Sequence, residues 1–88
     1  MPRVELTEES VAYTMKRLGE EFQKRLDEKG NLSLTSTHEV LGILEEEFLE
    51  LKLAIHANNH EDFESEVLDI TVGCIVAVMS KRVEGLDW

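Results

Sequence analysis

Cysteine is almost missing from this 88-residue chain, and cations are scarce. The single cysteine, Cys74, excludes an intrachain disulfide and suits a reducing cytoplasm, where we expect the protein to be located. Nine lysines and arginines stand against nineteen acids, so the net charge is -10. This balance argues against binding the phosphate backbone of nucleic acid. It permits a small anionic substrate where a metal ion bridges the substrate to the protein.

Long apolar runs are also missing. The N-terminal MPRVELTEES lacks the apolar segment of a signal peptide. The longest apolar stretch, residues 70–79, is interrupted by Thr71, Gly73 and Cys74 and is too short to span a bilayer. We therefore expect no membrane association. A chain of this length makes one small domain, residues 1–88, and small domains often gain stability by oligomerisation.

The periodicity of the chain predicts an all-α fold with three main helices, at about residues 8–29, 37–56 and 60–82. Thr7 is the expected cap of the first helix. Ser36, with Glu39 three residues later, forms a capping box that starts the second helix. Asn58 or Asn59 is expected to cap the third helix.

Each of the first two predicted helices carries an apolar stripe that should form its core face. In the first helix the stripe consists of Val11, Met15, Leu18, Phe22 and Leu26. Its charged residues, expected to point outward, are Lys16, Arg17, Glu20, Glu21 and Lys24. In the second helix the stripe consists of Val40, Leu41, Leu44, Phe48, Leu51 and Ile55.

The third helix is apolar on nearly every face, and its single polar stripe contains Asp62, Glu66, Asp69, Gly73 and Ser80. A helix of this kind is buried, and its acids must then be satisfied from inside the protein. One chain of three helices cannot cover it on every side, and the second helix adds Leu49 and Leu53 outside its core stripe. We therefore expect an obligate homo-oligomer, at least a dimer and as large as a tetramer, that forms a helical bundle across the interface.

Four acids on the second and third helices have the spacing of metal ligands. Glu47 and Glu50 are three residues apart, as are Glu66 and Asp69, so each pair shares one helix face. If the two helices are antiparallel, the four carboxylates can converge and repel one another. A hard cation that prefers oxygen ligands would relieve that repulsion, and we expect Mg²⁺, with Mn²⁺ as the other possibility.

Other chemistries find less support in the residues. The segment from Asp27 has Lys29, Leu32 and His38 at positions where a calcium-binding EF-hand needs an oxygen ligand, a glycine and an acid. No Glu-x-x-His pair of a di-iron bundle occurs, and no Cys–His or Ser–His pair indicates a nucleophile. Glu45 falls outside the acidic arc and is expected to be solvated.

The segments Glu46-Glu47-Phe48-Leu49-Glu50 and Glu66-Val67-Leu68-Asp69 together resemble the EExxE…ExxD signature of the all-α nucleoside triphosphate pyrophosphohydrolases. This superfamily includes MazG, the dimeric dUTPases and phosphoribosyl-ATP pyrophosphatase. The resemblance covers about residues 36–80 and is of the MazG type, although Ser65 stands where many relatives have a second acid.

The resemblance implies Mg²⁺-dependent hydrolysis of a nucleoside triphosphate or deoxynucleoside triphosphate to the monophosphate and pyrophosphate. It implies that Glu47, Glu50, Glu66 and Asp69 are the metal ligands. Glu46 could then deprotonate or orient a water. The candidate cations for the phosphates are Lys81 and Arg82, or Lys16, Arg17, Lys24 and Arg25 of a neighbouring subunit. The alternative hypothesis is a non-catalytic helical oligomer that uses the acidic cluster for metal-linked assembly or partner binding.

Overall fold

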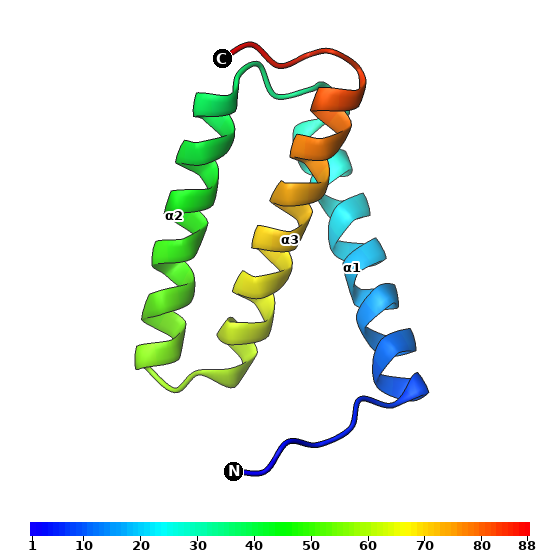
Figure 1. The fold of residues 1–88 in the computed structure, drawn as a ribbon, viewed down its shortest axis with the longest axis vertical. Helices are drawn as coiled ribbons and strands as arrows, with labels where there is room; N and C mark the ends of the chain where they lie inside the picture. Colours follow the sequence, from blue (N-terminus) through cyan, green and yellow to red (C-terminus); the bar gives the residue numbers. More distant parts are fainter.

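The computed structural model describes all 88 residues and contains three helices, α1 (Glu8–Lys29), α2 (Thr37–His56) and α3 (His60–Arg82). Helices α2 and α3 are antiparallel neighbours, and α1 lies on the other side of α3 (Figure 1). The predicted all-α bundle of three helices is confirmed, and the helices begin and end where the sequence predicted. None of them is both long and apolar enough to cross a membrane.

Capping side chains set the starts of the three helices. The predicted Thr7 and Ser36 cap α1 and α2, and Asn59, rather than its neighbour, caps α3. The capping box of α2 differs from the usual arrangement in one detail. The carboxylate of Glu39 accepts a hydrogen bond from the backbone N–H of Thr35, the residue before the cap, at 2.8 Å. The box therefore ties down the linker before α2 as well as the helix end.

The small core is centred on α3. Only five of the 88 residues are buried, and four of them lie on α3 in one row at four-residue spacing: Leu68, Val72, Val76 and Ser80. The fifth is Ala54 on α2. The prediction that α3 is buried is thus confirmed for the faces of α3 that meet α1 and α2. Of its other apolar residues, Val67, Ile70 and Ile75 are half-buried, and Phe63, Val78 and Met79 are exposed.

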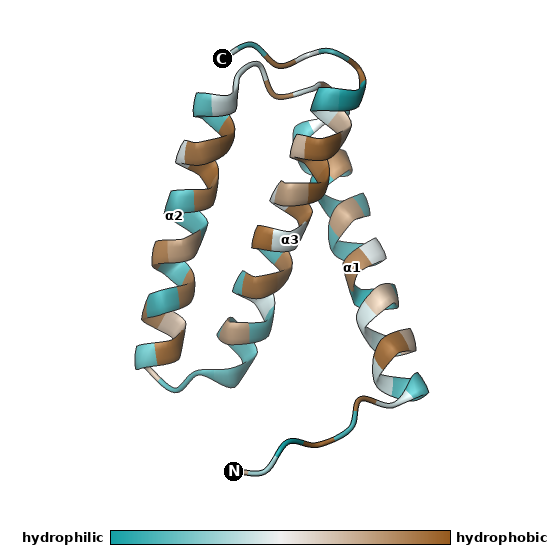
Figure 2. Ribbon diagram, viewed as in Figure 1, coloured by the Kyte–Doolittle hydropathy of each residue, from teal (hydrophilic) through white to brown (hydrophobic).

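The predicted core stripe of α2 is only half correct. Val40, Leu44 and Leu51 are half-buried on the side of α3, whereas Leu41, Phe48 and Ile55 are exposed together with Leu49 and Leu53. The reason is that α2 packs against α3 alone and is apolar over more of its circumference than one neighbour can cover. Hydrophobic residues accordingly recur along α2 and along α3 beyond its hydrophilic first turn (Figure 2).

Helix α1 packs against α3 and not against α2. No α1 residue is buried, and the N-terminal part of its predicted stripe, Val11 and Met15, is exposed. Toward this end α1 diverges from α3 (Figure 1), and long polar side chains make the contact. The hydroxyl of Tyr13 donates to the Glu64 carboxylate at 3.1 Å, and Arg17 lies 3.8 Å from the same carboxylate.

The C-terminal segment closes the opposite end of the bundle by pairing with the linker between α1 and α2. Asp87 donates its N–H to the carbonyl of Thr35 and accepts from the N–H of Thr37, both at 2.8 Å. The buried hydroxyl of Ser80 accepts from the N–H of Leu34 at 2.9 Å. Linker, tail and the end of α3 thus form one hydrogen-bonded cap over the bundle.

Candidate metal centre

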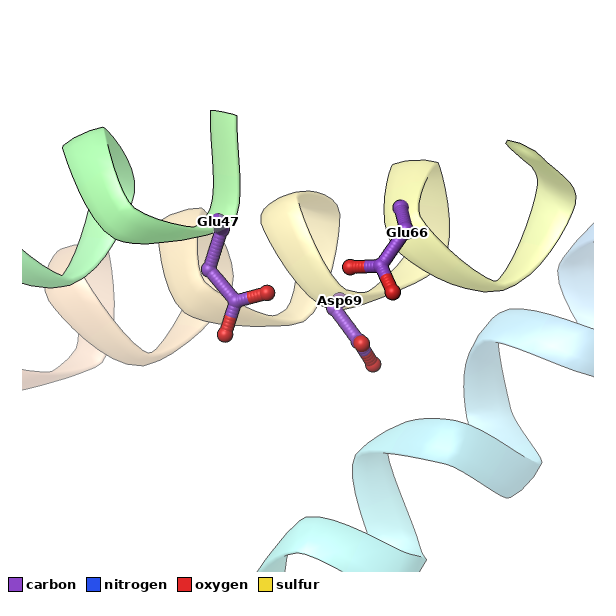
Figure 3. A group of neighbouring side chains, drawn as sticks. All are labelled: Glu47, Glu66 and Asp69. Carbon is purple, nitrogen blue, oxygen red and sulfur yellow. The ribbon is translucent and has the colours of Figure 1, made fainter. Parts of the chain in front are cut away.

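Two helices bring three carboxylates to one place. Glu47 projects from the middle of α2, and Glu66 and Asp69 project from successive turns of α3 (Figure 3). One oxygen of each side chain lies within 4.8 Å of one oxygen of each of the others. The antiparallel pairing of α2 and α3 produces this arrangement, because residues three apart share a helix face.

Two of these carboxylates have oxygens that are buried without a hydrogen-bond partner, Glu47 Oε2 and Glu66 Oε2. A buried polar oxygen without a partner is costly, and an ionised one more so. The acids that raise the pKa values of both groups, Asp69 and Glu50, cannot donate a hydrogen bond when ionised. The donor set, all oxygen and all anionic, therefore fits a hard divalent cation such as Mg²⁺ or Mn²⁺.

The pKa values of all three carboxyl groups are raised in this crowded site. Loss of solvation, followed by the interaction with Glu50 and then the charges of Asp69 and Glu47, raises the pKa of Glu66 from 4.5 to about 7. Loss of solvation is also the first cause of a raised pKa at Glu47, followed by the charge of Asp69. The pKa of Asp69 is raised by loss of solvation and then by the charge of Glu21 on α1. Each group resists ionisation beside the others, and a bound cation would reverse that tendency.

The other predicted site residues lie next to this group of three. Glu50 is exposed and lies outside the 4.8 Å cluster, but its carboxyl is close enough to raise the pKa of Glu66. Glu46 is exposed, and its charge is the weakest cause of the raised pKa of Glu47. The structure therefore brings together three of the four predicted ligands, with the fourth beside them and the predicted base on the outer side of α2.

A cavity of about 300 Å³ opens beside the carboxylates, between all three helices. Glu47 and Asp69 line one side of it. On the opposite side, α1 contributes three cations, Lys24, Arg25 and Lys29, and two acids, Glu21 and Glu28. The positive charges of Lys24 and Lys29 lower the pKa of Asp69, and so partly offset the crowding of the acids. The three α1 cations, called here the cationic wall, outnumber the two α1 acids, so the cavity can hold a metal ion beside Glu47 and Asp69 together with an anion beside α1.

The sequence did not predict that α1 of the same chain lines this cavity. Lys24 is exposed, as expected, but it also lines the cavity, whereas the prediction offered it to the phosphates only from a neighbouring subunit. Lys29, which also lines the cavity, was not among the predicted phosphate-binding cations. Glu21, also expected outward, lines the same cavity. A signal was present, since Glu21, Lys24, Arg25, Glu28 and Lys29 follow the spacing i, i+3, i+4, i+7 and i+8 of a single helix face. Lys16, Lys81 and Arg82 do not line the cavity.

Comparison with known proteins gives no relative from which to transfer a function: no family model, curated protein or solved structure matches this chain. The chemistry of the site must therefore be judged from its own side chains. These are three clustered carboxylates, two unpaired buried oxygens, and a facing α1 wall with three cations and two acids.

Proposed function

We propose that this chain is a Mg²⁺-dependent nucleoside triphosphate pyrophosphohydrolase that converts a ribo- or deoxyribonucleoside triphosphate to the monophosphate and pyrophosphate. One observation carries the proposal: carboxylates suited to a metal face cations suited to phosphates across a single cavity. A polyphosphate with a chelated divalent ion carries both kinds of charge. Such a ligand complements both walls of the cavity, whereas a cation alone or an anion alone complements only one of them.

The proposed role of each residue follows from its position in the cavity or beside it. Glu47, Glu66 and Asp69 would hold the ion, and Glu50 is close enough to join them when the ion draws the acids together. The chemistry that the ion supplies is polarisation of a phosphoryl oxygen and a bound water of lowered pKa. Lys24 and Lys29 offset the phosphate charge from the α1 side. Glu46, exposed beside Glu47, is the candidate that accepts the proton of the attacking water.

We also propose that the active form is a homo-oligomer. The radius of gyration is 14.8 Å, against about 12 Å for a compact domain of this length. Five apolar residues of α2, Leu41, Phe48, Leu49, Leu53 and Ile55, are 49–61% exposed, and exposed apolar patches often mark sites of protein association. A MazG-like assembly would cover these residues with helices of another subunit.

The decisive experiment is a screen of nucleoside triphosphates with Mg²⁺ or Mn²⁺, scored for pyrophosphate. Asp69→Asn and Glu47→Gln keep the side-chain shapes but remove charges from the cluster. We expect each to lower turnover about a hundredfold or more, through loss of several kcal/mol of transition-state stabilisation. Glu45→Gln, an exposed acid on α2 outside the cluster, is the matched control and should behave as wild type.

The products distinguish this reaction from its competitors. Hydrolysis at the inner anhydride bond gives pyrophosphate and monophosphate, whereas attack at the terminal phosphate gives orthophosphate and diphosphate. Folded wild-type protein that releases no pyrophosphate from any nucleoside triphosphate would favour the alternative, a non-catalytic oligomer assembled or recognised through its acids. Equal turnover by Asp69→Asn and wild type would place the reaction elsewhere.

A further inference from the structure

A second cavity, of about 180 Å³, lies between the C-terminal ends of α1 and α3 and the linker that follows α1. Its hydrophobic lining consists of Phe22, Leu26, Leu32, Val76, Met79 and Val83. In contrast to the cavity beside the carboxylates, it is lined by no acid, and Arg25 is its only charged residue. Mostly apolar cavities with a few polar groups are typical of sites that bind the uncharged part of a small molecule.

The two cavities adjoin each other, because Arg25 of α1 and Val76 of α3 line both. Val76 is seven residues after Asp69 on α3, which corresponds to roughly 10 Å along the helix axis. A ligand held by its phosphates at the carboxylates could therefore reach the apolar cavity with its other end. The separation is of the order of a ribose with one phosphate.

We infer that the apolar cavity receives the base of the nucleotide whose phosphates occupy the charged cavity, and that it determines which base is preferred. The inference rests on the proposed function and specifies its substrate. Lys24 and Lys29 line the charged cavity alone, so phosphates are favoured there. An uncharged planar ring is favoured in the apolar cavity, away from the carboxylates.

Three side chains give this cavity the means to bind a base. The ring of Phe22 offers a face for stacking, as aromatic side chains do in other nucleotide-binding sites. The guanidinium of Arg25 donates to the carbonyl oxygen of Gly30 at 3.1 Å, which holds it in place at the boundary between the cavities. Its planar face can also stack on a base. Asn31 supplies an amide with donors and an acceptor that can distinguish the edges of different bases.

Val83→Trp tests the inference by filling the cavity. Val83 lines it and is 70% exposed, so the larger side chain can be accommodated without disrupting the core. Val78→Trp is the matched control, since Val78 is also a valine near the end of α3, is 61% exposed and lines neither cavity. For both variants one measures KM for the four common nucleoside triphosphates and the inhibition constant of inorganic tripolyphosphate, which has no base.

We expect Val83→Trp to raise KM about tenfold or more, the factor expected from loss of one stacked base. The inhibition constant of tripolyphosphate and thermal stabilisation by Mn²⁺ alone should stay unchanged, and Val78→Trp should match wild type. A second variant, Asn31→Ala at an exposed linker position, does not depend on the fold accepting a tryptophan. It should change the ratio of kcat/KM between bases by severalfold.

The inference is overturned if Val83→Trp and Val78→Trp have the same KM, or if Val83→Trp weakens tripolyphosphate inhibition as much as it raises KM. It is also overturned if Val83→Trp dissociates an oligomer in light scattering while Val78→Trp does not, because the cavity would then lie in a subunit interface. Unchanged base preference in Asn31→Ala would count against it in the same way. Wild-type protein that yields no pyrophosphate would instead contradict the proposed function, and the inference with it.

Discussion

Glu66→Gln should change the stability of the fold in a way that depends on both pH and Mg²⁺. The pKa of Glu66 is raised from 4.5 to about 7 by lost solvation and by Glu50 and the other acids of the cluster. Between these two values the folded state binds a proton that the unfolded state releases. The stability associated with this group is therefore fully present below pH 4.5 and is lost as the pH rises through about 7.

The size of the effect follows from the two pKa values. At about 1.4 kcal/mol for each pKa unit, the loss at pH 8 is at most about 3 kcal/mol, and solvent screening of a partly exposed carboxyl makes it smaller. Glutamine resembles the protonated glutamate and does not ionise. We expect Glu66→Gln to equal wild type in stability near pH 4.5 and to exceed it by about 1–3 kcal/mol at pH 8 in the presence of a chelator.

In the presence of Mg²⁺ the wild type should be more stable than Glu66→Gln. An ion that binds only the folded state at a hundred times its dissociation constant stabilises the wild type by about 2.7 kcal/mol, and Glu66→Gln should lose most of this gain. The assay is denaturant unfolding at both pH values, at fixed protein concentration and ionic strength, with Glu45→Gln as the exposed control. The reasoning is refuted if the advantage of Glu66→Gln is the same at both pH values, or if Mg²⁺ stabilises the variant as much as the wild type.

Further predictions concern the end of the bundle and the cationic wall. Gly85→Ala should destabilise the fold by about 1–3 kcal/mol, because an added Cβ would overlap the side chain of Ser33; Gly42→Ala, within α2 and facing open space, should stabilise it by up to about 1 kcal/mol. Thermal or denaturant unfolding measures the stability of both variants, and a Gly85→Ala protein as stable as wild type would contradict the packing described. Lys24→Gln and Lys29→Gln should leave the fold intact and raise KM for nucleoside triphosphates severalfold in the pyrophosphate assay. Unchanged KM values would show that the α1 cations do not face the substrate.

Local signals explain why the helices and the acidic cluster could be predicted from the sequence. Caps such as Thr7 and Ser36 act on the backbone within three residues, and the three-residue spacing of Glu66 and Asp69 defines a shared face whatever lies around it. The predicted convergence with Glu47 needed one further assumption, an antiparallel turn between α2 and α3, and a short connection made that the simplest geometry.

The position of α1 depends on packing that the sequence does not specify. Periodicity shows that Lys24 shares a face with Glu28, but not which face of α1 turns toward α3. The apolar stripe favoured Val11 and Met15 as contacts, whereas the N-terminal half of α1 is held by Tyr13 and Arg17 through Glu64. The cationic wall could therefore be located only once the docking of α1 was known.

The last prediction concerns Ser80, the most buried side chain of the protein at 2% exposure. Its hydroxyl accepts from the N–H of Leu34, and its carbonyl accepts from the N–H of Gly85 at 2.8 Å. One residue of α3 thus holds both the linker and the C-terminal tail, next to the apolar cavity that it also lines.

Ser80→Ala leaves the N–H of Leu34 without its partner, which should cost about 1–3 kcal/mol of stability. Thr71→Val is the matched control, because the Thr71 hydroxyl donates only within α3, to the carbonyl of Val67 at 2.8 Å, and its removal should be nearly neutral. Amide hydrogen exchange should accelerate at Leu34 in Ser80→Ala and stay unchanged in Thr71→Val. Equal exchange in the two variants would mean that the linker is held by its backbone pairing with the tail rather than by Ser80.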